Sequence, residues 1–97
     1  MNYLLYEDDQ VKGTARWRET EKGIKLERFA VLAVDRGKGA GTLLLKRVLE
    51  DVTPLGKEIY LHAQVSAMDF YLKAGFKVKG DGFEEAGIQH FLMIFRP

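Results

Sequence analysis

The sequence contains no cysteine and only two prolines and one tryptophan among its 97 residues. The absence of cysteine excludes disulfide bonds, thiolate catalysis and zinc sites built on cysteine. The two histidines, His62 and His90, lie far apart in the sequence and show no recognisable metal-ligand spacing. We therefore expect no metal site, and the composition suits a reducing compartment.

The chain also lacks an excess of charge of either sign. Lysine and arginine number 15 against 14 aspartates and glutamates, so the formal net charge is +1 and no global field attracts nucleic acids or acidic membranes. No stretch reaches the roughly 18 apolar residues of a membrane span. The N-terminal stretch MNYLLYEDDQ has neither the basic region nor the long apolar core of a signal peptide. We expect a cytoplasmic protein that binds neither nucleic acid nor membranes.

The composition provides enough apolar material for one folded domain. Hydrophobic residues make up 46% of the chain and charged residues 30%, which is the balance of an ordinary globular protein. A chain of this length supports one hydrophobic core and no second one. We therefore expect residues 1–97 to form a single domain.

Alternating polar and apolar residues predict strands in the first third of the chain. The segments NYLLYE and VKGTARWRE read as a hairpin, and a turn over residues 20–23 leads into a third strand. This strand alternates at first and becomes continuously apolar from Phe29 to Val34, which favours burial on both faces. Apolar residues then recur with helical spacing until Pro54 and Gly56 end the pattern. They are Leu43, Leu44, Leu45, Val48, Leu49 and Val52.

The second half of the chain predicts shorter elements. EIYLHA reads as a strand, and a short helix follows with Ser66 as its N-cap and Gly75 at its end. FKVKG reads as a strand, residues 81–87 as a loop, and IQHFLMIF as the last strand. The order of three strands, helix, strand, helix and two strands favours a mixed α/β (α+β) fold with an antiparallel start and finish.

The glycine-rich stretch VDRGKGAGTLLLKRV joins the third strand to the first helix. The first amides of a helix have no intrahelical partner and carry the positive end of the dipole, so this arrangement suits phosphate binding. The glycine spacing fits neither a Walker loop nor the dinucleotide fingerprint. It has the form R/Q-x-x-G-x-G/A at Arg36, Gly39 and Gly41, although a tight turn with a glycine cap would leave the same residues.

That form resembles the pyrophosphate loop of the GNAT superfamily of acetyl-CoA-dependent N-acetyltransferases. Four further motifs resemble its small bacterial branch, typified by ElaA and YjcF: Leu-Glu-Arg, Ala-Gln, Phe-Tyr-x-x-x-Gly-Phe and Gly-Ile-x-His. They occur in the family's order between residues 16 and 93. Members of the branch usually begin with a further strand and two helices that wall the acceptor site. The resemblance therefore implies an N-terminally short acetyltransferase domain.

The resemblance implies a mostly antiparallel sheet whose central strands splay apart, with two helices after the central strand. The cosubstrate acetyl-CoA would lie in the gap, bonded to backbone groups of the central strand. For Arg36 and Lys38 an exposed loop cation is the alternative, and Gln64 would otherwise bond a strand-end carbonyl. The residues implied in coenzyme binding are Val31, Leu32, Val34, Arg36, Gly37, Lys38, Gly39, Ala40, Gly41, Thr42, Gln64, Phe70 and Tyr71.

The family's reaction is direct attack of a primary amine on acetyl-CoA in a ternary complex, and the resemblance implies three catalytic residues. Tyr71, in the Phe-Tyr motif, would be the general acid for the leaving thiolate, or else a core tyrosine. His90, in Gly-Ile-x-His, would shuttle the amine proton, or else bond to the backbone. His62 is read as structural.

Glu27 matches a position where members of the superfamily often hold a general base. A salt bridge with Arg16, Arg18 or Arg28 is the alternative, and both interpretations stay open.

Two further functions are compatible with the sequence. Without the acceptor wall, the chain would bind acyl-CoA but not turn it over. The first strand, as an exposed sheet edge, would pair with a second copy and form a homodimer. The acceptor itself is predicted only as a small-molecule or peptide amine.

Overall fold

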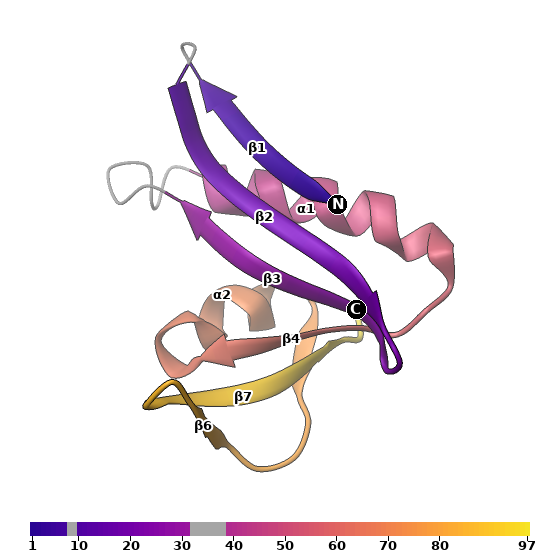
Figure 1. Ribbon diagram of the computed structural model, residues 1–97, viewed down its shortest axis with the longest axis vertical. Coiled ribbons are helices and arrows are strands. Elements are labelled where there is room, and N and C mark those ends of the chain that lie inside the picture. The colour runs from indigo at the N-terminus through magenta and orange to yellow at the C-terminus, as the bar shows by residue number, and fades with distance from the viewer. Residues whose placement is uncertain (8–9, 32–38) are drawn as a thin grey trace.

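The computed structural model describes residues 1–7, 10–31 and 39–97. Within these residues a single sheet contains seven strands, and two α-helices pack with it (Figure 1). The strands are β1 (Asn2–Glu7), β2 (Gln10–Thr20), β3 (Gly23–Val31), β4 (Ile59–Gln64), β5 (Phe76–Val78), β6 (Phe83–Glu85) and β7 (Ile88–Phe95). The helices are α1 (Ala40–Val52) and α2 (Met68–Lys73), with the 3-10 turns η2 (Thr53–Leu55) and η3 (Val65–Ala67).

The sheet order is β1-β2-β3-β4-β7-β5, with β6 beside β7. Every pairing is antiparallel except β3 with β4, so the predicted mixed and mostly antiparallel fold is confirmed. β1 forms one edge, as predicted, and its pairing with a second copy stays a prediction. None of the helices in the described part of the chain is long and apolar enough to cross a membrane.

The hydrophobic core lies between the sheet and the helices. Leu44, Leu45, Val48 and Val52 of α1 are buried because the helix presents one apolar stripe to the strands. Leu43, predicted on the same stripe, is 59% exposed, because three consecutive residues of a helix cannot all face one side. Figure 1 shows α1 running behind β1, β2 and β3, and α2 beside β4.

Two further local predictions were wrong. Ser66 lies inside η3 rather than at an N-cap, and α2 begins after Ala67 without a side-chain cap. Residues 81–87, predicted as a loop, contain β6, whose three residues pair with β7. The hairpin was missed because FEE offers only three residues to a pattern and its partner strand supplies the hydrogen bonds.

The parallel pairing of β3 and β4 is short. It joins Ile24 to Ile59, Lys25 to Tyr60 and Leu26 to Leu61, and no pairing follows. On its other side, β3 carries an irregularity: between Arg16 and Thr14 of β2 the register advances three residues along β3 instead of two. Such a bulge bends a strand and increases its twist. Consistent with this, β3 and β4 diverge toward their C-terminal ends in Figure 1.

Candidate active site

A cleft of about 920 Å³ opens where β3 and β4 separate. Its lining comes from β3, the start of α1, β4, η3, α2 and β7, so segments far apart in the sequence meet there. The structure brings eight of the predicted site residues to this cleft: Glu27, Gly39, Gly41, Thr42, Gln64, Phe70, Tyr71 and His90. The splayed strands are thus the main structural feature of the site.

The N-terminus of α1 forms one end of the cleft. Gly39 is its N-cap with φ 83° and ψ 0°, a left-handed conformation that glycine adopts without strain. Among the described residues no side chain caps the helix, and its first turn contains no acidic residue. The first amides, together with the positive end of the dipole, are therefore available to an anion.

Several residues predicted to bind the coenzyme are not among the described residues that line the cleft. Val31 is the last residue of β3 and pairs with Gly13 of β2, and Ala40 begins α1. Leu32, Val34, Arg36, Gly37 and Lys38 lie outside the described residues. The predicted contacts of Leu32 and Val34 with the pantetheine arm, and of the other three residues with the pyrophosphate, stay predictions.

Tyr71 lies on α2 with its side chain turned into the core, and it is 8% exposed. Its ring makes edge contacts with Phe29, Phe70 and Phe76 at centroid distances of 6.2, 5.1 and 5.7 Å. Burial raises the pKa of the Tyr71 phenol to about 12, so the hydroxyl is protonated at neutral pH. Tyr71 is therefore a core residue that also lines the cleft, and its role as general acid stays a prediction.

The Glu27 carboxylate is surrounded by positive charge. Arg18 Nε donates to both carboxylate oxygens, at 3.2 and 3.3 Å. Arg16, directly opposite in the β2–β3 register, places its Nε 3.4 Å from Oε1. Lys25 Nζ lies 3.9 Å from Oε2. The salt bridge that the sequence left as an alternative is thus present with Arg16 and Arg18, and the role of general base stays a prediction.

The two histidines face the cleft and share one carboxylate. His90 is buried, and its Nδ1 lies 2.8 Å from the backbone oxygen of Ile88, so this bond to the backbone is present as the sequence allowed. Its Nε2 lies 3.5 Å from Glu85 Oε2. The other oxygen of Glu85 lies 3.3 Å from His62 Nδ1. In the described part of the chain no group of three or more potential metal ligands is close enough to hold an ion.

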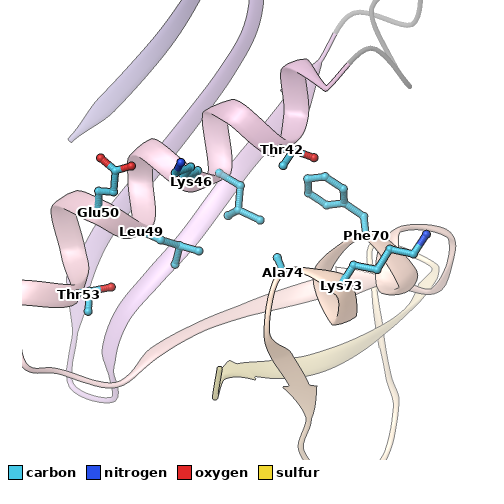
Figure 2. Close-up of a pocket in the computed structure, with 9 residues that line it drawn as sticks. Thr42, Lys46, Leu49, Glu50, Thr53, Phe70, Lys73 and Ala74 are labelled. Atoms are coloured by element: carbon cyan, nitrogen blue, oxygen red, sulfur yellow. The ribbon is translucent and has the colours of Figure 1, made fainter.

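A second hollow of about 450 Å³ lies between α1 and α2. Thr42 and Phe70 line both this hollow and the cleft, so the two spaces adjoin. Figure 2 shows the Phe70 ring pointing from α2 toward Thr42 on α1. Lys46 and Lys73, one from each helix, also line this hollow, which therefore combines apolar walls with two cations.

Sequence reasoning missed some of the cleft. Ala63, Ser66 and Ala67 line it, and such small residues carry no signal that separates a cleft wall from a core. His62 was read as structural although it also lines the cleft. Period-two alternation places His62 and Gln64 on one face of β4, and this signal could have identified it.

Comparison with known proteins agrees with this geometry. Residues 1–96 match the family described as Acetyltransferase (GNAT) domain. The chain is 33% identical over 93 residues to the uncharacterized N-acetyltransferase YjcF of Bacillus subtilis, covering 94% of this chain and 66% of that protein. It thus spans less than two thirds of the length of the curated relatives that it matches first.

Solved structures share the fold. The crystal structure of Escherichia coli ElaA superposes with a TM-score of 0.85 at 26% identity, covering 99% of this chain and 67% of that one. An acyl-CoA N-acyltransferase from Pseudomonas aeruginosa gives a TM-score of 0.84 at 25% identity, with 99% and 67% covered. The overall backbone arrangement is thus similar to that of the structure described as an acyl-CoA N-acyltransferase.

Proposed function

This chain belongs to the GNAT family of acetyltransferases, and we propose that it moves an acetyl group from acetyl-CoA to a primary amine by direct attack in a ternary complex. The resemblance that the sequence motifs carried is confirmed by the family match. The proposal is supported mainly by the cleft, which brings an uncapped helix N-terminus and a protonated tyrosine together between two splayed strands.

The residues present are suited to a long, phosphate-bearing coenzyme. The pyrophosphate would lie on the first amides of α1, at Gly39, Gly41 and Thr42, because no side chain in the described part of the chain caps them. The pantetheine arm would lie along β3 beyond Leu26, where the strand has no partner on β4. The adjoining hollow offers apolar walls and the cations Lys46 and Lys73 for the rest of the molecule.

Acetyl-CoA would supply the thioester that the amine attacks. Tyr71 would donate its phenolic proton to the leaving sulfur. Because burial raises the pKa of the phenol, the proton is present on the oxygen at neutral pH. Within the described residues no hydrogen-bond acceptor engages this hydroxyl, so the proton is available to a ligand in the cleft. The phenol would then act as a general acid without competition from a protein partner.

The acceptor amine would approach from the face of the sheet that the helices do not cover. Glu27 and His62 are level on neighbouring strands, one residue past the last β3–β4 pair, and their side chains share the face away from the helices. His90 lies opposite Gln64 on the same face. We place Glu27 and His90 at this side, where their charge and polarity would orient an incoming ammonium group.

Two measurements on one sample test the proposal. Acetyl-CoA is titrated while the amide resonances of Gly39, Gly41 and Thr42 are followed by NMR, with Gly56 as a reference amide at the far end of α1. Free thiol is then measured with a panel of primary amines. We expect shifts at the three cleft amides and amine-dependent thiol release. Shifts without release for any amine would favour coenzyme binding alone, and no shift would remove the proposal.

A further inference from the structure

His62 stands in the cleft with one ring nitrogen fixed by the protein. Its ring lines the cleft from β4 and packs edge-on against Phe83 of β6, at a centroid distance of 5.0 Å and an angle of 76°. Its Nδ1 lies 3.3 Å from Glu85 Oε1, also on β6. The side chain is 28% exposed, so a molecule in the cleft can reach it. The β6–β7 hairpin thus holds this imidazole from one side.

The contact with Glu85 determines the state of the ring. An ionised carboxylate only accepts hydrogen bonds, so the proton of neutral His62 resides on Nδ1. Nε2 then carries a lone pair, and in the described part of the chain no group bonds to it. A carboxylate that orients an imidazole in this way also stabilises the imidazolium formed when the ring takes up a proton. This is the arrangement that a general base requires.

The other two candidate bases are more constrained. His90 has Nδ1 bonded to the Ile88 carbonyl, and its Nε2 lies 3.5 Å from Glu85 Oε2 on a side chain that is only 8% exposed, so an amine in the cleft has little access to it. Both carboxylate oxygens of Glu27 accept hydrogen bonds from Arg18, and Arg16 and Lys25 flank them, so the carboxylate is already occupied by cations. Of these three candidates, His62 combines a ring oriented by a carboxylate with the more exposed side chain, at 28% against 8% for His90 and 20% for Glu27.

We infer that His62 is the general base of the proposed reaction and that Glu85 is its positioning residue. His62 Nε2 takes a proton from the substrate ammonium, and the neutral amine attacks the acetyl carbon. The C–N bond forms and the C–S bond breaks. The sulfur takes the Tyr71 proton, and the second amine proton returns through solvent to the phenolate. His62 finally releases its proton, so one ammonium and one thioester give one amide, one thiol and one proton.

The inference rests on the proposed function, and it identifies the substrate class as amines that are protonated at neutral pH. An amine of low basicity is already neutral and needs no base before attack. Comparing the two kinds of amine therefore separates the loss of a base from general damage to the site.

The decisive experiment measures thiol release by the full chain and by His62→Gln with a basic alkylamine and with a weakly basic amine such as methoxyamine. We expect kcat/KM for the alkylamine to fall by about 100-fold and that for methoxyamine by about threefold or less. Added imidazole should restore part of the alkylamine rate. Equal losses for both amines, or no loss, would overturn the inference. Absence of thiol release by the unaltered chain would overturn the proposed function as well.

Glu85→Gln tests the positioning role, with Glu84→Gln, its exposed neighbour on β6, as the control. Four titratable groups lie around His62: Glu85 on β6, Tyr60 on the same strand, Glu27 on β3 and His90 on β7. His90 is linked to His62 by the Glu85 carboxylate, which lies close to both rings. Glutamine still accepts from Nδ1 but no longer stabilises the imidazolium. We expect the acidic limb of the kcat/KM pH profile to move to lower pH in Glu85→Gln and to stay in place in Glu84→Gln. An unmoved limb in both variants would contradict the role of Glu85.

Discussion

The two ends of the β3–β4 pair differ in chemistry as well as in geometry. At the N-terminal end, Ile24, Leu26, Ile59 and Leu61 are all at most 6% exposed, and the Ile24 amide donates to the Glu58 carbonyl at 2.7 Å. At the C-terminal end the strands separate, and charged and titratable side chains face a cleft. One pair of strands thus holds the core together at one end and opens a site at the other.

The difference shows how a small sheet can carry an open site. A cleft exposes backbone groups and polar side chains, which stabilise the fold less than a packed core does. At the closed end the backbone of Gly23 packs closely against that of Glu58. Gly23 has φ 131°, and a Cβ at that position would clash with the Glu58 carbonyl. Stability should therefore be concentrated at the closed end and activity at the open end.

The largest expected effect is on stability at the closed end. Ile24→Ala removes a fully buried side chain and should lower the free energy of unfolding by about 3 kcal/mol. Ile88→Ala makes the same chemical change at a site that is 46% exposed, and should cost about 0.5 kcal/mol. Urea unfolding of both variants gives the comparison. Similar losses in the free energy of unfolding would show that the closed end contributes no more to stability than the exposed site does.

Two tyrosines make the same comparison for activity. Tyr71→Phe should lower kcat by about 100-fold while the affinity for acetyl-CoA stays unchanged, because the lost group acts on the leaving sulfur. Tyr60→Phe loses a hydroxyl contact with Thr20 at 2.6 Å at the closed end, and should lower stability by about 1 kcal/mol while activity is retained. Steady-state kinetics and coenzyme titration check both variants. An unchanged rate in Tyr71→Phe would assign that residue to the core alone.

Alkaline pH should reveal the burial of Tyr71. Its pKa is raised from 10.0 to about 12 in the folded state, so stability is fully present below pH 10 and falls as the pH rises toward 12, where only the unfolded chain ionises readily. The loss should be about 2 kcal/mol greater in the unaltered protein than in Tyr71→Phe. Unfolding free energies measured at pH 9 and pH 11.5 give the difference. Parallel curves for the two proteins would contradict the assignment.

The smallest effect compares two left-handed glycines. Gly39 and Gly56 have φ 83° and 71°, and no atom of the described residues lies within 4 Å of a Cβ added at either position. Replacement by alanine should therefore cost each about 1 kcal/mol of stability from backbone strain alone. Only Gly39→Ala should also weaken acetyl-CoA binding, by about fivefold, because Gly39 lies at the helix end facing the cleft. Equal affinities in the two variants would argue against that binding site.

Much of the fold could be predicted because its signals are local. The hairpin of β1 and β2 follows from alternation, and α1 follows from its apolar stripe and the residues that end it. β6 could not be predicted, since three residues become a strand only when β7 lies beside them. Leu43 was predicted on the buried face of α1 but is exposed, and Ser66 was predicted as an N-cap but lies inside η3. Both positions depend on packing rather than on residue type.

The sequence by itself determined which elements form, the family to which the chain belongs, and the residue types at the helix N-terminus and in the Phe-Tyr motif. The tertiary structure alone decided which side chains share the cleft. His62 and Glu85 are 23 residues apart and meet only because β6 folds back on β7, which pairs with β4. Periodicity reports which face a residue takes along its own element. Contacts between elements depend on strand order and on how far the sheet splays, and no local pattern encodes either.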